Sequence, residues 1–451
     1  MHISDPAILH HLHIEAFSPM QEAAIRAQQN GRDLVLLSPT GSGKTLAFLV
    51  PLASAVDATS GALQAVVVVP SRELALQCHA VFERMKTGLK SLPLYGGRPT
   101  MEEHRRLRDL QPQVVFATPG RLCDHLSKEN ILPATVRRLV VDEYDKCLEL
   151  GFQAEMEQLT ARLTAVRQTV FTSATPLKEN VGGGELAQRA AKADVLDCLE
   201  TLPAAEGGPD AAERIRTYLV RSPRRDKLET LARLLSQLPQ ASVIVFVAHR
   251  ESAERVCAYL KREGFDAVLY HGGLEQQLRE RALFRFRSGC ASVLVSTDLA
   301  ARGLDIPEVE AVVHYHLSPD AEAFTHRQGR TARWEREGRA YLILNDADAL
   351  PDYLPATVEE LDVEACDVRP QHSRLTTLYI GRGKKEKLSK GDIVGFLCKK
   401  GGLRSDELGL IEVQDHQSYV SIPRRRLREV LQLVQGERIK GMKTLVEEMR
   451  S

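Results

Sequence analysis

Short apolar runs alternate with longer amphipathic stretches over residues 30–175 of this chain. Runs of this kind predict strands of a parallel sheet, because strands buried between two layers of helices are apolar throughout. We predict five such strands, DLVLLS (33–38), AVVVVP (65–70), QVVFAT (113–118), RLVVDE (138–143) and QTVFTS (168–173). Residues 201–212, TLPAAEGGPDAA, are rich in proline, glycine and alanine and predict a linker.

The same alternation returns after this linker and predicts a second α/β domain. Its strands are expected at SVIVFVA (242–248), DAVLYHG (266–272), SVLVST (292–297), EAVVHYH (310–316) and GRAYLIL (338–344).

A third segment has the order β-α-β-β-α-β, which is typical of the split βαβ sandwich. The expected elements are LTTLYI (375–380), a helix near 389–398, IEV (411–413), SYVSI (418–422), a helix from Pro423 and a strand near 442–446. We therefore predict three domains, residues 1–205, 214–365 and 374–451, joined by linkers at 206–213 and 366–373.

Length and composition agree with this division. At roughly 150 residues per domain, 451 residues predict two or three domains. The content of 43% hydrophobic and 27% charged residues is typical of globular proteins. The sequence has no apolar run of membrane-spanning length, no leader-like start and no CxxC pair among its eight cysteines. We expect a cytoplasmic protein without a zinc site or a disulfide framework.

Charge is distributed unevenly, although the 60 basic and 60 acidic residues balance over the whole chain. Residues 374–451 hold 17 lysines or arginines and 10 acids, against 43 and 50 in residues 1–373. Positive charge concentrated in one end predicts a polyanionic partner, while a solvated basic surface is the alternative.

A phosphate-binding loop follows the first predicted strand as SPTGSGKT (38–45), with Ser38 in place of the usual first glycine. Small residues let backbone N–H groups surround phosphates, and the next helix presents its positive end. Lys44 is expected to reach the terminal phosphates and Thr45 to bind Mg²⁺. The remaining loop residues expected to hold the nucleotide are Thr40, Gly41, Ser42 and Gly43.

Two carboxylates end the fourth predicted strand, in the run LVVDEYD. A nucleotide hydrolase needs one carboxylate to hold Mg²⁺ and another to orient water, which suits Asp142 and Glu143 respectively. An Asp-Glu pair alone is more often a solvated loop. Together with the phosphate-binding loop, the pair predicts nucleotide hydrolysis.

Further short motifs follow in a fixed order along the chain. They are PSRELA (70–75), Gly96-Gly97, TPGR (118–121), DEYD (142–145), SAT (173–175), HGGLEQQLR (271–279), STDLAARGLDI (296–306) and HRQGRTAR (326–333). With the phosphate-binding loop, this series resembles the DEAD-box ATP-dependent RNA helicases of superfamily two. The resemblance covers nearly the whole chain and implies an α/β protein with two tandem RecA-like parallel-sheet domains.

The resemblance also implies which residues contact RNA and ATP. Backbone contacts to RNA, which ignore base identity, are expected at Pro70, Arg72, Gly97, Thr118, Pro119, Gly120, Arg121, Gln276, Arg279, Thr297 and Asp298. Gly303 and Asp305 match positions at the γ-phosphate and the ribose, while Arg330 and Arg333 match the arginine fingers. Without the family, Arg327, Arg330 and Arg333 could equally form a solvated helix face.

Some positions depart from the family pattern. Gln21 matches the residue that reads adenine, but no aromatic residue precedes it where the family stacks the base. Tyr144 replaces an alanine beside Asp145, which with Ser173 and Thr175 is implied to couple hydrolysis to unwinding. Either neighbouring space has adapted to the ring, or the ring disturbs that coupling.

The C-terminal segment resembles the RNA-binding domain of DbpA-type DEAD-box proteins, a divergent RNA recognition motif. The matching stretches are IGRGKKEKLSKGDIVGFL (380–397), IPRRRLREVLQLVQG (422–436) and RIKGMK (438–443). In that family the domain ties the helicase to ribosomal RNA during large-subunit assembly.

Strand alternation in this segment predicts an RNA-stacking platform. Leu378 and Ile380 should face the helices, as should Val420 and Ile422, which leaves Tyr379 and Tyr419 on the open face. The alternative is that both tyrosines are β-formers on a solvated sheet. Beside them, Arg424, Arg425 and Arg426 are expected in the first turn of a helix, where a phosphate would balance their charge.

The prediction is an ATP- and Mg²⁺-dependent RNA helicase that acts as a monomer on structured, ribosomal RNA. An RNA-binding assembly factor or annealer with weak ATPase coupling is the first alternative, and a DNA helicase the second. RNA-stimulated against DNA-stimulated ATP hydrolysis distinguishes them.

Overall fold

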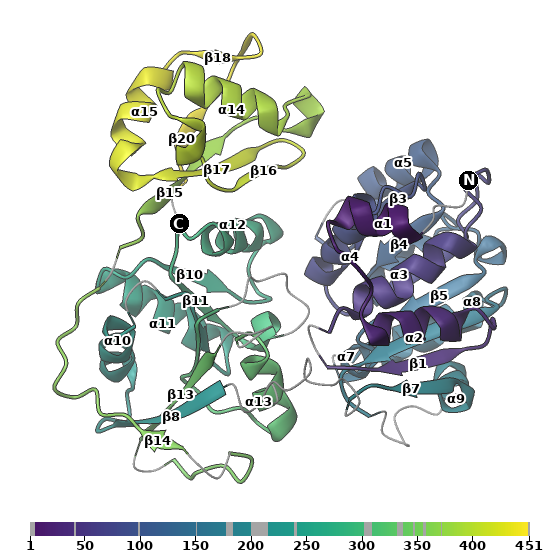
Figure 1. The fold of residues 1–451 in the computed structure, drawn as a ribbon, viewed down its shortest axis with the longest axis horizontal. Helices are drawn as coiled ribbons and strands as arrows, with labels where there is room; N and C mark the ends of the chain where they lie inside the picture. Colours follow the sequence, from purple (N-terminus) through teal and green to yellow (C-terminus); the bar gives the residue numbers. More distant parts are fainter. Residues whose placement is uncertain are drawn as a thin grey trace. The chain divides into compact units, whose positions relative to one another are not determined.

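The structure is a computed structural model. It describes residues 5–39, 42–97, 100–149, 151–176, 184–199, 215–238, 241–301, 309–331, 337–345, 348–354, 358–370 and 372–449. The chain divides into two compact units, the first formed by residues 1–208 and 303–305, the second by residues 209–302 and 306–451 (Figure 1). Each unit contains a seven-stranded sheet.

The first unit has a parallel sheet in which the predicted strands lie side by side. In sheet order the strands are β3 (Ser91–Leu94), β4 (Val114–Ala117), β2 (Ala65–Val68), β5 (Arg138–Val141), β6 (Gln168–Ser173), β1 (Leu34–Leu37) and β7 (Asp194–Asp197). The order places the carboxyl ends of β1, β5 and β6 together; β1 and β5 precede predicted nucleotide residues, and β6 precedes predicted coupling residues.

Helices cover both faces of this sheet, as its apolar strands predict. Val140 faces a core with α1, α3 and α4, while Leu139 and Val141 face a core with α5, α6, α8 and α9. The helices of the unit are α1 (Asp5–Leu12), α2 (Pro19–Gln28), α3 (Lys44–Ala55), α4 (Arg72–Arg84), α5 (Thr100–Leu110), α6 (Pro119–Ser127), α7 (Tyr144–Glu149), α8 (Gln153–Arg162) and α9 (Glu185–Lys192).

The second unit repeats this architecture, which confirms the predicted pair of RecA-like domains. Its sheet order is β10 (Ala267–Tyr270), β11 (Val293–Ser296), β9 (Val243–Phe246), β12 (Ala311–His314), β13 (Gly338–Asn345), β8 (Ile215–Ser222) and β14 (Glu359–Glu360). Its helices are α10 (Leu228–Ser236), α11 (Arg250–Arg262), α12 (Gln276–Arg287) and α13 (Ala321–Gln328), with a 3-10 turn at Asp298–Ala301.

The C-terminal segment forms a small α+β domain within the second unit (Figure 1). Its antiparallel sheet has the order β16 (Ile411–Val413), β17 (Ser418–Pro423), β15 (Leu375–Ile380) and β20 (Val446–Glu448). Helices α14 (Lys390–Lys399) and α15 (Leu427–Val434) cover one face, and β18 (Arg438–Ile439) pairs with β19 (Met442–Lys443). Leu378, Ile380, Val420 and Ile422 all lie in the core beneath these helices, as predicted.

Five of the described strands were not predicted, namely β3, β7, β8, β14 and β18, and the strand expected near 442–446 is divided between β19 and β20. Strand β3 contains Pro93 and β7 carries Asp194 and Asp197, so neither has the apolar run of a central strand. Both lie at sheet edges, where proline and charge are tolerated. The domain boundaries stay predictions, and residues 366–370 contact the RecA-like fold through Cys366–Gln237 and Arg369–Ser236 hydrogen bonds.

Among the described residues, no helix is both long enough and apolar enough to cross a membrane.

Candidate nucleotide and RNA site

The phosphate-binding loop connects β1 to α3. Ser38, the residue in place of the usual glycine, is fully buried and its hydroxyl donates to the Ser42 hydroxyl at 2.6 Å. Gly43 has a φ of 90° and precedes the first helical residue, Lys44. The loop therefore has the strand-before, helix-after context that phosphate binding requires. Thr40 and Gly41 lie outside the described residues.

The Lys44 amine lies over the loop. It donates to the carbonyl of Ser38 and, at 2.8 Å, to the carbonyl of Pro39. Burial lowers the pKa of Lys44, while Coulombic attraction from Asp142 and Glu143 raises it. A half-buried cation of this kind gains stability from an added anion such as a phosphate. Thr45 follows it in the first turn of α3.

Asp142 and Glu143 lie at the carboxyl end of β5. Asp142 is only 4% exposed and accepts hydrogen bonds from the Thr172 hydroxyl at 2.5 Å and the Glu143 N–H at 3.1 Å. Burial raises the pKa of Asp142, whereas the Thr172 hydrogen bond and the Lys44 charge lower it. Glu143 has a φ of 49°, a left-handed conformation that is uncommon outside glycine and often marks functional turns.

Thr172 is a positioning residue that the motif analysis missed. Its hydroxyl donates to Asp142 and also accepts the Glu143 N–H at 3.2 Å, so it fixes the turn that carries both acids. The available signal was its place in QTVFTS, directly before the SAT motif, on the strand that pairs with β5.

The three predicted coupling residues lie together. The Thr175 hydroxyl donates to Asp145 Oδ2 at 3.1 Å, and the Ser173 hydroxyl donates to the Thr175 carbonyl at 2.6 Å. Burial raises the pKa of Asp145, and Lys146 and the Thr175 hydrogen bond lower it. The end of β6 is thus connected directly to the turn after β5.

Tyr144 is part of the core. Its side chain is buried, with its ring centroid 5.0 Å from that of Phe171 and a tilt of 57° between the rings. Burial raises the pKa of Tyr144 to about 12. Because the Asp145–Thr175 hydrogen bond coexists with the ring, the structure favours adaptation of the neighbouring space over disturbed coupling.

We expect Tyr144→Ala to lower the free energy of unfolding by about 3–5 kcal/mol, because it leaves a cavity beside Phe171. Chemical denaturation measures this loss, and Tyr144→Phe is the matched control that keeps the ring. Unwinding per ATP, measured on the folded fraction, should stay constant. A severalfold rise in that ratio would show that Tyr144 uncouples hydrolysis from unwinding.

Gln21 lies against the phosphate-binding loop. Its Nε2 donates to the Gly43 carbonyl at 3.1 Å, and its Oε1 accepts the Ser18 N–H at 2.9 Å in a capping box at the start of α2. A Cβ atom on Gly43 would lie 2.5 Å from Gln21 Nε2. The side chain is buried in this position. Adenine recognition stays a prediction.

The Arg72 guanidinium lies against Gly96 and Gly97, which leave room for it because they have no Cβ atom. A Cβ atom on Gly97, which has a φ of 90°, would lie 2.5 Å from Arg72 Nη1, and one on Gly96 would lie 3.2 Å from Nη2. Nearby, Thr118 is the N-cap of α6, Pro119 is its first residue, and Gly120 borders open space. Pro70 is buried at the end of the strand segment before α4.

Arg121 differs from the expectation of an exposed phosphate contact. Its side chain is 10% exposed, its Nε lies 3.3 Å from Glu103 Oε2, and its Nη1 donates to the Thr100 hydroxyl at 2.6 Å. Glu103 also contacts His125 Nε2 at 3.0 Å. The charge of Arg121 is already balanced, so its RNA contact stays a prediction.

The predicted residues of the second unit lie at the ends of β11 and α13 and at the start of α12. Arg279 donates to Gln276 Oε1 at 2.5 Å, and Arg327 donates to both oxygens of Asp298 at 2.5 and 3.2 Å. Thr297 is half-buried. Arg327 and Arg330 are 1% and 2% exposed, so the alternative of a solvated helix face is wrong for both. Gly303, Asp305 and Arg333 lie outside the described residues.

Tyr379 and Tyr419 do not form the open platform that we predicted. Both rings do lie on the face opposite the helices, but Tyr419 is 0% exposed because Phe284 and Met449 cover it. Tyr379 is half-buried, with the Arg281 guanidinium 5.6 Å from its ring centroid. Strand alternation identifies the face correctly but does not reveal that α12 occupies it.

Arg424, Arg425 and Arg426 do not lie in the first turn of an α-helix, where we predicted them. They form a 3-10 turn, and α15 begins only at Leu427. Arg424 pairs with Asp266 at 2.9 Å, and Arg426 pairs with Glu407 at 3.2 Å and Glu429 at 2.7 Å. Arg425 is largely exposed and lies 3.8 Å from Glu407. Carboxylates, rather than a phosphate, explain the placement of Arg424 and Arg426.

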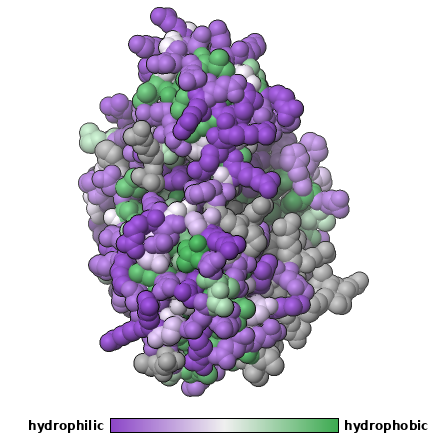
Figure 2. All heavy atoms as spheres, turned by 90° about the vertical axis from the view of Figure 1, so that its left-hand side faces the viewer, coloured by the Kyte–Doolittle hydropathy of each residue, from purple (hydrophilic) through white to green (hydrophobic). Residues whose placement is uncertain are grey.

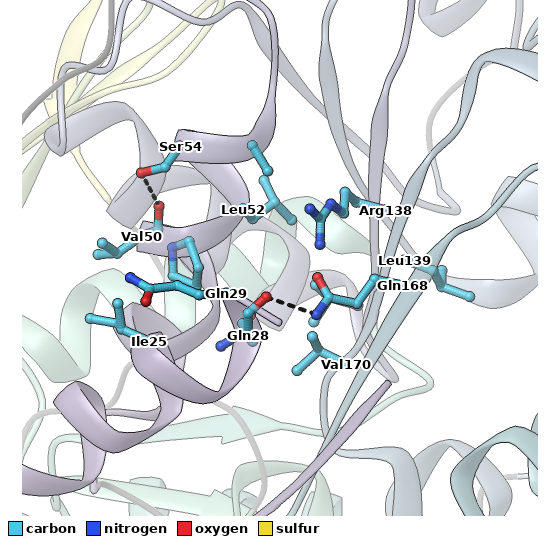
Figure 3. A pocket seen from close by; sticks show the side chains of 13 residues that line it. Ile25, Gln28, Gln29, Val50, Leu52, Ser54, Arg138, Leu139, Gln168 and Val170 are labelled. Carbon is cyan, nitrogen blue, oxygen red and sulfur yellow. Dashed lines mark hydrogen bonds between the residues drawn. The ribbon is translucent and has the colours of Figure 1, made fainter. Parts of the chain in front are cut away.

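A separate cavity of about 230 Å³ lies at the amino ends of the central strands β5 and β6 (Figure 3). The phosphate-binding loop lies at the opposite, carboxyl ends of the strands. Pro51 of α3 cannot donate to the Ala47 carbonyl, and Gln28 Nε2 satisfies that carbonyl at 2.9 Å. Gln168 Nε2 in turn donates to the Gln28 carbonyl at 3.0 Å. The cavity thus lies beside the C-terminal ends of α2 and α3 and is distinct from the nucleotide site.

Three family models match successive parts of the chain. A DEAD/DEAH box helicase model matches residues 18–182, a helicase conserved C-terminal domain model matches residues 226–335, and a DbpA RNA binding domain model matches residues 377–448.

Individual proteins show the same similarity. The chain is 34% identical to the ATP-dependent RNA helicase DbpA of Escherichia coli K12, over 94% of this chain and 92% of that protein. It is 33% identical to the ATP-dependent rRNA helicase RRP3 of Yarrowia lipolytica, over 73% and 68% of the two chains. The structure of Saccharomyces cerevisiae Dbp5 bound to RNA and ADP BeF3 has a TM-score of 0.67, 25% identity and coverage of 80% and 94%.

Proposed function

Since the chain belongs to the DEAD-box ATP-dependent RNA helicases, with a DbpA-type RNA-binding domain, we propose that it remodels structured ribosomal RNA during large-subunit assembly. The observation that carries this proposal is the joining of a helicase core to a basic C-terminal domain of the DbpA type. A relative whose name specifies ribosomal RNA, RRP3, supports the same substrate class.

In the proposed cycle, ATP binds at the loop before α3 and the Lys44 amine exchanges the Ser38 and Pro39 carbonyls for phosphate oxygens. Glu143 accepts a proton from the attacking water, and Arg330 supplies positive charge to the transferring phosphoryl group. The Asp145–Thr175 hydrogen bond transmits the state of this turn to the end of β6. RNA is held through its backbone, so that many duplexes can be separated locally.

Mg²⁺ fits the residues of this site. Carboxylate and hydroxyl oxygens are the hard ligands that Mg²⁺ prefers, and Asp142 and Thr45 supply them. Because burial raises the pKa of Asp142, a nearby divalent cation would stabilise its ionised form. When bound, Mg²⁺ neutralises charge that develops on the phosphate oxygens.

We also propose that the protein acts as a monomer in the cytoplasm. Its eight cysteines are free thiols, six of them buried, which suits a reducing compartment. One chain contains both RecA-like domains and the RNA-binding domain, so the cycle needs no residue from a second copy.

RNA specificity of the ATPase tests the substrate proposal. We expect stem-loops from large-subunit ribosomal RNA to stimulate ATP hydrolysis by the full chain more strongly than unstructured RNA or DNA stem-loops of equal length. Equal stimulation by all RNAs would rule out the proposed target. Strong RNA binding with constant ATPase activity would instead favour the assembly factor or annealer.

A further inference from the structure

Helix α12 covers the sheet of the C-terminal domain on the face where RNA recognition motifs stack bases. The Phe284 and Tyr419 rings are fully buried with their centroids 5.3 Å apart, and Met449 packs beside them. At the edge of this contact, Gln277 Nε2 donates to Gln417 Oε1 at 2.8 Å. A base could reach Tyr419 only after the two domains separated.

A charged clamp holds the other end of the contact. Arg424 Nη2 donates to Asp266 Oδ2 at 2.9 Å, and Arg424 Nε donates to the Ser373 carbonyl at 2.9 Å. The Ser373 N–H also donates to Asp266 Oδ2, at 2.6 Å. Asp266 of the RecA-like domain therefore binds both Arg424 and Ser373, which lies in the segment that enters β15.

Docking adds one side chain of the RecA-like domain to a groove of the C-terminal domain, which makes this groove a composite one. It brings Arg287, the last residue of α12, to 3.4 Å from Glu412 in β16. A cavity of about 350 Å³ lies here. Its charged lining is Arg287, Lys384 and Lys390 with one acid, Glu412, and its apolar lining includes Leu388, Ile411 and Val413.

The segment that supplies two of these cations is strongly positive. Residues 384–390, KKEKLSK, contain four exposed lysines and one acid, Glu386, whose Oε2 already accepts the Gly383 N–H at 2.8 Å. Cationic side chains around an apolar cavity suit a nucleotide of single-stranded RNA, with its phosphates on the rim and its unstacked base inside. Figure 2 shows mainly hydrophilic side chains over this domain, at the top of the view.

We propose that this composite groove, rather than the sheet face, is where the C-terminal domain holds a single-stranded nucleotide of structured RNA. The site rests on the proposed function, because it assumes that the domain anchors such RNA. It also makes α12 a shared element, since α12 carries Arg287 at one end and the predicted RNA contacts Gln276 and Arg279 at the other.

Salt titrations of RNA binding by the full chain test the rim. The probes are labelled stem-loops with single-stranded flanks, which tile large-subunit ribosomal RNA. Arg287→Gln, Lys384→Gln and Lys390→Gln should each lower the slope of log affinity against log salt by about 0.7, the value for one phosphate contact to a single strand. Lys399→Gln, at the other end of α14, is the matched control and should leave the slope unchanged.

The decisive residue is Arg287, because it belongs to the RecA-like domain. An unchanged slope in Arg287→Gln would overturn the composite groove, even if the two lysine variants bound RNA more weakly. Glu412→Gln should act in the opposite direction and strengthen binding, since it removes the acid that now pairs with Arg287. Weaker binding by Glu412→Gln would also contradict the proposal.

Charge reversal tests whether docking completes the groove. Arg424→Asp sets two carboxylates against each other, so it should undock the domain, weaken RNA binding and raise amide hydrogen exchange in α12. The pair Asp266→Arg with Arg424→Asp should restore both properties, which a direct phosphate contact by Arg424 would not allow. Tyr419→Glu, which would bury a charge against Phe284, is a second undocking variant.

Two results separate the groove from the function on which it rests. If the parent protein bound ribosomal stem-loops no better than unstructured RNA, the proposed function would fail. If the parent preferred them but undocking strengthened binding, the sheet face would be the stacking surface and the groove would be wrong.

Discussion

Replacing Glu143 with glutamine should lower RNA-stimulated ATP hydrolysis by about 10²–10⁴-fold, the usual contribution of a general base. ATP and RNA should still bind, so the variant accumulates as a complex with both. The structure supports this separation because the Glu143 backbone N–H, which glutamine keeps, makes the contacts to Asp142 and Thr172. Single-turnover hydrolysis and nucleotide binding, measured on the same preparation, check the two parts.

A matched control exists at Glu129, an exposed glutamate that also has a left-handed backbone, with a φ of 56°. Glu129→Gln makes the same chemical change in a similar conformation and should hydrolyse ATP at the parent rate. Hydrolysis at the parent rate by Glu143→Gln would show that another group activates water.

Lys44→Ala should lose the same activity for a different reason. The Lys44 amine donates to the Ser38 and Pro39 carbonyls of the phosphate-binding loop, so its removal lowers the affinity for the nucleotide itself. Comparison of the two variants therefore distinguishes phosphate binding from water activation.

The parallel sheets could be predicted because their central strands are apolar throughout, and the nucleotide and coupling residues because they follow three of those strands. Edge strands such as β3 and β7 lack this signal, since proline and charge are permitted there. The neighbour relation of β5 and β6 is also absent from the sequence, and Thr172 acquires its role only through that pairing.

The C-terminal domain illustrates a different limit. Alternation along β15 and β17 correctly assigns Tyr379 and Tyr419 to one face, since side-chain direction depends only on local geometry. The contact that covers that face depends on Phe284 and Asp266, which lie more than 130 positions earlier in the chain and whose own segments contain no motif for docking. The positive end of the chain was predictable, but the acids that balance Arg424 and Arg426 were not.

Arg330→Ala should lower the turnover number by about 10³–10⁵-fold, the range expected for loss of an arginine finger. Binding of isolated nucleotide should change little, because the resemblance assigns this side chain to the transition state of the closed enzyme. The Arg330 carbonyl accepts the Val309 N–H at 3.0 Å, and this backbone contact survives the substitution. Arg330→Lys keeps the charge without the planar fork and should recover only part of the rate.

Arg327→Ala provides the contrast that makes this test specific. Arg327 is as buried as Arg330, but it binds both oxygens of Asp298 and the His316 carbonyl, so its loss leaves a carboxylate without its cation. We expect that variant to lose about 3–5 kcal/mol of stability. A structural role for Arg330 would give the same signature, a lower melting temperature with normal turnover per folded molecule. A finger instead lowers turnover per folded molecule, because the transition state depends on its charge.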